Sequence, residues 1–119
     1  MKNVYIFWDR DKKEVTISFD PSLFNYSWHG DFEHYFYRLK NAVQVLNEKL
    51  SVKAINIESI DKNIVLKLNP EDIIAVDDNE EYADIVFIEN GWQYTLAISY
   101  INGSLNFGVK YMESYGLFN

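Results

Sequence analysis

Cysteine is absent from the 119-residue chain, which excludes disulfide frameworks, thiolate catalysis and cysteine-ligated zinc sites. The sequence also lacks an apolar run long enough to span a bilayer, and its first residues do not form the apolar stretch of a signal peptide. We therefore expect a cytoplasmic protein. The five glycines and two prolines form neither a linker nor a glycine-rich phosphate loop. A single α+β domain over residues 1–119 is predicted.

Basic residues are scarce in the C-terminal part of the chain. The formal net charge is −7, and it is unevenly distributed. Residues 1–70 carry 9 acidic and 10 basic side chains, whereas residues 71–119 carry 9 acidic side chains and one basic side chain, Lys110. Nucleic acids and anionic membranes need a positive surface, so we expect neither as a partner. The acidic part favours a basic protein partner, although charge of this kind also serves solubility alone.

Aromatic residues are plentiful, at 17% of the chain, and supply material for a core. Residues 4–8 and 14–19 are β-favouring and flank a charged turn at residues 9–13, so they predict a hairpin. Residues 31–50 predict a long amphipathic helix, with Asp31 as its N-cap. Its apolar stripe comprises Phe32, Phe36, Leu39, Val43, Leu46 and Leu50.

The middle of the chain contains weaker signals. Residues 52–59 and 64–68 predict two strands that flank a turn at residues 60–63. Asn69 and Pro70 are typical of a helix start, so a short helix is expected to end near Val76. The acidic residues 77–81 are expected to form an exposed loop.

Two asparagine–glycine pairs organise the C-terminal third. Asn90-Gly91 and Asn102-Gly103 are dipeptides of type I′ turns, and each turn fixes the register of its flanking strands. The two turns are independent of each other, yet both registers place apolar residues on the same face of the strand that they share. That face comprises Ile85, Phe87, Tyr94, Leu96, Ile98, Tyr100, Leu105, Phe107, Val109 and Tyr111.

The expected fold class is therefore α+β. The strands and helices follow one another as ββ-α-ββ-short α-βββ, and the last three strands form an antiparallel meander. We expect one antiparallel sheet with the long helix packed on its apolar face.

No arrangement of residues predicts an enzyme, a cofactor or a metal site. His29 and His34 are five residues apart, whereas helical ligand pairs are separated by three or four residues. Asp9 and Asp11 fit a hairpin turn beside basic residues. The acidic run at residues 77–84 has no glycine at the position that a calcium loop requires. No serine lies in a nucleophile elbow.

A small acidic inhibitor or other protein-binding protein is the expected function. Its sharpest form is an immunity-type protein that neutralises a toxin, for which a basic nuclease is a suitable example because its surface must hold phosphates. The alternatives are a phage-type inhibitor that mimics the charge of nucleic acid, and a small-ligand-binding domain. The predicted partner-binding residues supply negative charge and aromatic anchors: Asp77, Asp78, Glu80, Glu81, Tyr82, Asp84 and Trp92. The sequence does not predict the oligomeric state.

Overall fold

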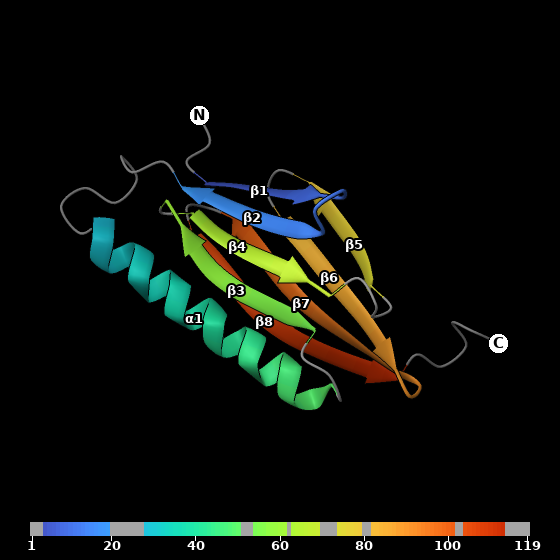
Figure 1. Ribbon diagram of the computed structural model, residues 1–119. Coiled ribbons are helices and arrows are strands. Elements are labelled where there is room, and N and C mark those ends of the chain that lie inside the picture. Colours follow the sequence, from blue (N-terminus) through green and yellow to red (C-terminus); the bar gives the residue numbers. More distant parts are fainter. Residues whose placement is uncertain are drawn as a thin grey trace.

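A computed structural model describes residues 4–19, 28–50, 54–61, 63–69, 74–79, 82–101 and 104–113. In these ranges the chain forms one α-helix and eight strands (Figure 1). The strands form two four-stranded antiparallel sheets. The expected α+β class is confirmed. The expected single sheet is wrong: the hydrogen bonds divide the strands into two sheets, whose inner faces share one core with the helix.

Sheet A has the strand order β1-β2-β4-β3. Its strands are β1 (Val4–Asp9), β2 (Glu14–Phe19), β3 (Ile55–Ile60) and β4 (Asn63–Leu68). The two predicted hairpins are confirmed. They are joined by pairing between β2 and β4, which places Ile17 opposite Ile64 across a long stretch of sequence. Such pairing depends on tertiary packing, and the sequence pattern did not predict it.

Sheet B is a simple meander in the order β5-β6-β7-β8. Its strands are β5 (Ile74–Asn79), β6 (Tyr82–Glu89), β7 (Trp92–Ile101) and β8 (Ser104–Glu113). Every predicted cross-strand pair is confirmed, from Glu89 opposite Trp92 to Tyr94 opposite Tyr111. Asn90 and Gly91 have φ angles of 52° and 79°, which fit the expected type I′ turn. Residues 102–103 of the second turn lie outside the described residues.

Strand β5 replaces two predicted features. The last three residues of the expected short helix, Ile74 to Val76, form strand β5 instead, and residues 70–73 lie outside the described residues. Asp77 to Asn79 also belong to this strand and not to a loop. Ile74 and Val76 favour a strand whereas Asp77 to Asn79 do not, and pairing with β6 satisfies the backbone of the whole segment; this tertiary gain outweighs the local helix-start signal of Asn69 and Pro70.

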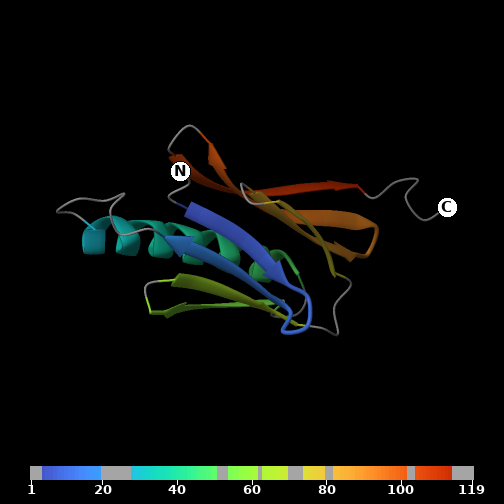
Figure 2. The ribbon, with the colours of Figure 1, turned by 90° about the horizontal axis from the view of Figure 1, so that it is seen from above.

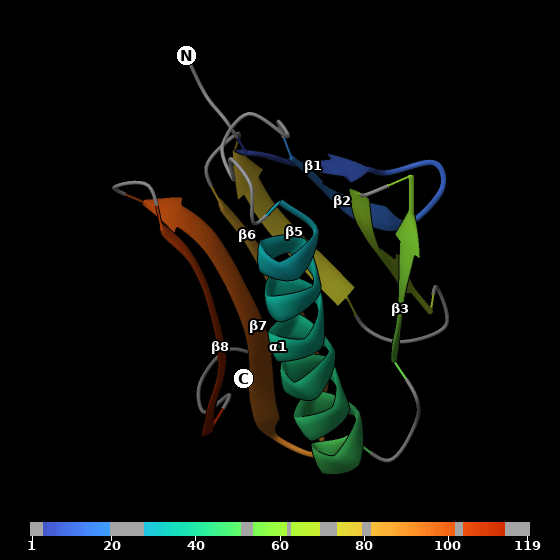
Figure 3. The ribbon, with the colours of Figure 1, turned by 90° about the vertical axis from the view of Figure 1, so that its left-hand side faces the viewer.

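The helix α1 spans Trp28–Lys49 and lies between the two sheets. It therefore begins before Asp31, and the expected N-cap at Asp31 is wrong. Figure 3 shows the helix with β7 and β8 of sheet B on one side and β2 and β3 of sheet A on the other, and Figure 2 shows the same layers from above. Helix α1 contacts β3 of sheet A and both β7 and β8 of sheet B, and β1 contacts β5 and β6 where the sheets meet.

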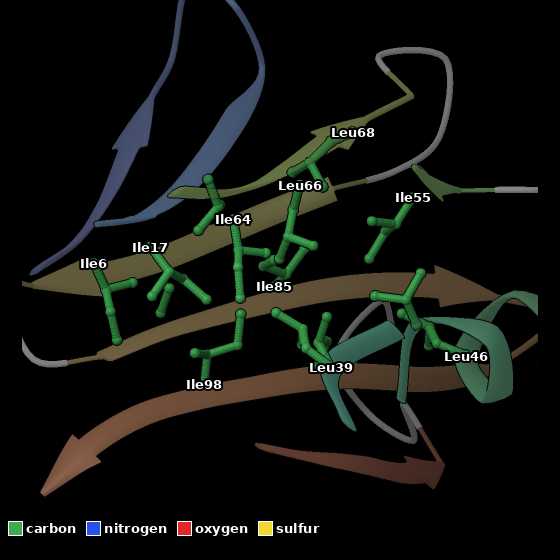
Figure 4. Close-up of a cluster of buried hydrophobic side chains, with 14 of the residues drawn as sticks. Ile6, Ile17, Leu39, Leu46, Ile55, Ile64, Leu66, Leu68, Ile85 and Ile98 are labelled. Atoms are coloured by element: carbon green, nitrogen blue, oxygen red, sulfur yellow. The ribbon is translucent and has the colours of Figure 1, made fainter. Parts of the chain in front are cut away.

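The core lies between the helix and the inner faces of both sheets. Leu39 and Leu46 of α1 are fully buried against side chains from both sheets (Figure 4). Near the start of the helix, aromatic rings connect the sheets: Tyr35 contacts Phe19 of sheet A and Phe107 of sheet B. The predicted apolar stripe of the helix is confirmed, with Phe36 half-buried. Of the predicted core face of the meander, Tyr111 is the exception: it lies near the end of β8 and remains 57% exposed.

Asn47 attaches the last turns of the helix to sheet A. Its side-chain nitrogen donates a hydrogen bond to the carbonyl oxygen of Ile55 at 2.9 Å. Its side-chain oxygen accepts hydrogen bonds from the backbone N–H groups of Ala54 and Ile55, at 2.9 and 3.2 Å. Both of these residues are buried, so Asn47 satisfies polar groups at the start of β3 that water cannot reach. These bonds fix the position of the C-terminal end of α1.

Candidate functional site

The predicted acidic residues lie along the pairing of β5 and β6. Asp77 is opposite Asp84, and Asp78 is opposite Ala83. Tyr82 begins β6, and both Tyr82 and Asp84 are half-buried. Glu80 and Glu81 lie outside the described residues. The register thus brings two of the predicted acidic positions, Asp77 and Asp84, next to each other.

Trp92 is separated from this group. It is opposite Glu89 at the far end of β6, seven residues beyond Tyr82. At the rise of a β-strand this corresponds to about 23 Å. Alternation along β6 and β7 also places Asp84 on the outer face of sheet B, whereas Trp92 shares the inner face with Leu96. The predicted residues therefore do not form one compact site.

Trp92 instead belongs to an aromatic and acidic group at the other end of sheet B. The register aligns Glu89, Trp92 and Glu113 in one row across β6, β7 and β8. The neighbouring row contains Tyr94 and Tyr111. The rings of Trp92 and Tyr111 are in contact, with centroids 6.3 Å apart, and the two residues are 39% and 57% exposed. Such a pair offers a large rigid apolar surface to a partner.

The last turn of α1 completes a hollow whose lining includes Tyr94, which shares a face of β7 with Trp92, and we call it the Trp92 hollow. It has a volume of about 230 Å³ and lies between the helix and the β6–β7 turn. The residues that line it are Glu48, Lys49, Leu50, Glu89, Asn90 and Tyr94. The Nζ atom of the lining residue Lys49 lies 4.5 Å from the centroid of the Tyr111 ring, so Tyr111 lies next to the hollow, and we call Tyr94, Trp92 and Tyr111 its aromatic rim.

The chemistry of the hollow suits a positively charged group. Two of its lining residues, Glu48 and Glu89, are acidic and one, Lys49, is basic. Glu113, which is opposite Trp92 in the same row, adds a third acidic residue at this end of sheet B. The faces of aromatic rings also attract cations, and the ring of Tyr111 already holds the ammonium group of Lys49. Carboxylates and aromatic faces therefore act in the same direction.

The other residues considered from the sequence have structural surroundings of their own. The carboxylate of Asp9 accepts hydrogen bonds from the backbone N–H groups of Asp11 and Lys12, which fits a turn role for this pair. His34 is exposed on α1. Within the described ranges no group of three histidine, aspartate or glutamate side chains is arranged to hold a metal ion. No helix in those ranges is long and apolar enough to cross a membrane.

Sequence reasoning identified Trp92 and missed most of its neighbours. The predicted registers already paired Glu89 with Trp92 and Tyr94 with Tyr111, so the aromatic rows could have been found from the meander alone. Tyr111 was instead assigned to the core. Glu48 and Lys49 could not be found, because only the packing of α1 brings them to this end of sheet B.

A second pair of exposed aromatic residues lies on sheet A. Tyr5 and Phe7 of β1 are 42% and 48% exposed and lie two residues apart on the same outer face. Their partners across the register are Ser18 and Thr16, which carry no charge. This pair offers apolar surface without the acidic residues that lie in the same row as Trp92.

Comparisons of the chain with protein-family models, with curated proteins and with solved structures found no match.

Proposed function

We propose that the protein binds and inhibits a basic protein through the Trp92 end of sheet B. The sharpest form of this proposal is an immunity-type protein that neutralises a toxin such as a basic nuclease. A single observation carries it: Trp92 and Tyr111 are exposed in ring contact, and Lys49, over the Tyr111 ring, belongs to the lining of a hollow that also includes Glu48 and Glu89. Exposed aromatic anchors of this kind dominate the affinity of many protein interfaces.

The charge distribution supports the same proposal. No lysine or arginine occurs between Glu71 and Val109, a segment that includes most of sheet B. A surface of one sign accelerates the encounter with an oppositely charged partner, and the aromatic residues then contribute to the lifetime of the complex. The acidic positions Asp77 and Asp84 act in this account through their field. They need not touch the residues that contact Trp92.

The size of the hollow favours a protein partner over a small ligand. Pockets for drug-sized ligands usually enclose roughly 300–1,000 Å³. The Trp92 hollow has about 230 Å³, and it lies at the surface between the last turn of α1 and a hairpin turn. A space of that size suits one inserted side chain within a wider contact surface.

A pull-down from native lysate at low salt, eluted with increasing salt and analysed by mass spectrometry, tests the proposal. We expect one basic protein that elutes as the salt concentration rises. Substitution of Asp77, Asp78, Glu80 and Glu81 by serine should lower its elution salt. Trp92→Ala should weaken its binding by roughly 30-fold, the loss of an interface hot spot of about 2 kcal/mol.

Phe7→Ala is the matched control, because Phe7 is also an exposed aromatic side chain on a strand but lies on sheet A. It should leave capture of the partner unchanged. Capture that survives Trp92→Ala, or that Phe7→Ala weakens equally, would contradict the proposed surface. Failure to capture any basic protein would contradict the proposed function.

A further inference from the structure

We propose that the Trp92 hollow is a receptor for a guanidinium group, so that one arginine side chain of the partner inserts into it. This inference rests on the proposed function for the source of the arginine. The hollow itself can be tested without any partner.

The aromatic rim provides a face for a planar cation. Trp92 and Tyr111 are in ring contact at 58° to each other, and Tyr94 lines the hollow beside them. A guanidinium group is planar and weakly hydrated, so it stacks on aromatic faces more readily than an ammonium group does. Tyr111 is 57% exposed, which leaves part of its ring accessible to such a group.

Glu48 and Glu89 come from two separate elements, the last turn of α1 and the end of β6, and both residues belong to the lining of the hollow. A carboxylate can accept two parallel hydrogen bonds from the N–H groups of one guanidinium, and this bidentate geometry fixes the orientation of the arginine side chain. Charge and shape therefore favour arginine over a neutral side chain of similar length.

Lys49 already illustrates this chemistry within the chain. Its Nζ atom lies 4.5 Å from the centroid of the Tyr111 ring, which makes it an internal occupant of the aromatic face. An incoming guanidinium must share the hollow with this ammonium group or displace it. Lys49 thus lowers the affinity of the site, and its removal should raise the affinity for arginine. A purely structural role of Lys49 would not predict a gain.

The test is a titration of the whole protein with Nα-acetyl-arginine amide, followed by backbone and indole NMR signals. We expect saturable shifts at Asn90, Gly91 and Trp92 and none in the β1–β2 hairpin of sheet A. Nα-acetyl-citrulline amide, which has the same shape without the charge, should cause none of these shifts. Binding of citrulline amide, or binding of Nα-acetyl-lysine amide with equal affinity, would overturn guanidinium recognition.

Two pairs of variants sharpen the titration. Lys49→Met should tighten arginine binding by roughly two- to fivefold, the fold-change expected from removal of a competing cation–π contact at an exposed site. Lys40→Met removes the same charge from an exposed position elsewhere on α1 and should leave the affinity nearly unchanged. Tyr111→Leu should weaken binding, whereas Tyr37→Leu, at a tyrosine that is 58% exposed on α1, should not.

The outcomes separate this inference from the proposed function. If the arginine amide causes no shifts at the hollow while a basic partner is still captured and lost with Trp92→Ala, the guanidinium site is wrong and the binding function stands. If the amide binds at the hollow but no basic partner is captured, the guanidinium site stands and the inhibitor function fails. If Lys49→Met weakens the binding of arginine amide, the proposed competition is wrong.

Discussion

Sheet A and sheet B have the same number of strands and differ in both connection and surface chemistry. Sheet A combines two hairpins that precede and follow the long helix in the sequence, through pairing of β2 with β4. Sheet B is a continuous meander formed by neighbouring segments. The segments of sheet A contain both acidic and basic residues, whereas those of sheet B contain Lys110 as their single basic residue. The strand order of sheet A therefore depends on tertiary packing, whereas that of sheet B is local, and the acidic surplus lies in sheet B.

The exposed aromatic pairs sharpen this contrast. Tyr5 and Phe7 on sheet A lie opposite uncharged residues, while Trp92 on sheet B lies in a row with Glu89 and Glu113. The same kind of apolar surface therefore occurs in two electrostatic settings. Partner recognition by a basic protein should use the pair on sheet B.

The largest expected effect concerns the core that both sheets share. Leu39 is fully buried on α1 between them, so Leu39→Ala should lower the free energy of unfolding by about 2–5 kcal/mol. Urea denaturation measures this change, and hydrogen exchange should show amides of β4 and β6 losing protection together. Val45→Ala, at a helix position that is 43% exposed, should change stability by about 0.5 kcal/mol or less. Loss of protection in only one sheet would contradict a shared core.

Asn47 offers a way to weaken the attachment of the helix to sheet A alone. Asn47→Ala removes three hydrogen bonds and leaves buried backbone groups of Ala54 and Ile55 without these partners. We expect a loss of about 2–3 kcal/mol, with faster amide exchange at the start of β3. Gln44→Ala is the control on the exposed face of the same helix, where the cost should be about 0.5 kcal/mol or less. An equal increase in exchange across sheet B would show that Asn47 does not act locally.

The sequence predicts the local features of the fold and not its long-range contacts. The helix stripe and the meander registers were predictable, because a helical period and two-residue turns are local properties. Pairing of β2 with β4, the bonds of Asn47 and the strand β5 were not, because they depend on contacts between distant segments. The candidate site divides in the same way: Trp92 was found because it follows a turn and lies outside the predicted core stripes, while Glu48 and Lys49 required the packed helix.

Two glycines of sheet B should respond differently to the same substitution. Gly91 has a φ of 79°, so Gly91→Ala should cost about 1 kcal/mol although no atom blocks the added methyl group. Gly108 lies within β8 without a positive φ and also has open space around it, so Gly108→Ala should be neutral or stabilise by about 0.5 kcal/mol. Thermal unfolding of both variants measures the difference. Equal effects would contradict the local turn as the source of register in sheet B.

The smallest expected effect is the pH dependence of an ion pair on the outer face of sheet A. The Glu58 carboxylate raises the pKa of Lys67, first through its hydrogen bond and then through its charge. A raised pKa in the folded state stabilises the protein fully below the unfolded pKa of about 10.4, and this contribution disappears as the pH rises through the folded pKa. The difference in Tm between the wild type and Glu58→Gln should therefore be small at pH 9 and vanish at more alkaline pH. A difference that grows with alkaline pH would contradict this assignment.

The most direct test compares equal losses of charge on the two sheets. One variant combines Asp84→Asn, Glu89→Gln and Glu113→Gln on sheet B. The other combines Glu14→Gln and Glu58→Gln on sheet A with Asp61→Asn in its β3–β4 turn. Both remove three negative charges, and the association rate with the captured partner is measured at low salt. We expect the sheet B variant to associate at about one tenth of the wild-type rate or more slowly, and the sheet A variant to keep the wild-type rate. Equal slowing in both variants would mean that net charge alone governs the encounter, and it would contradict sheet B as the binding surface.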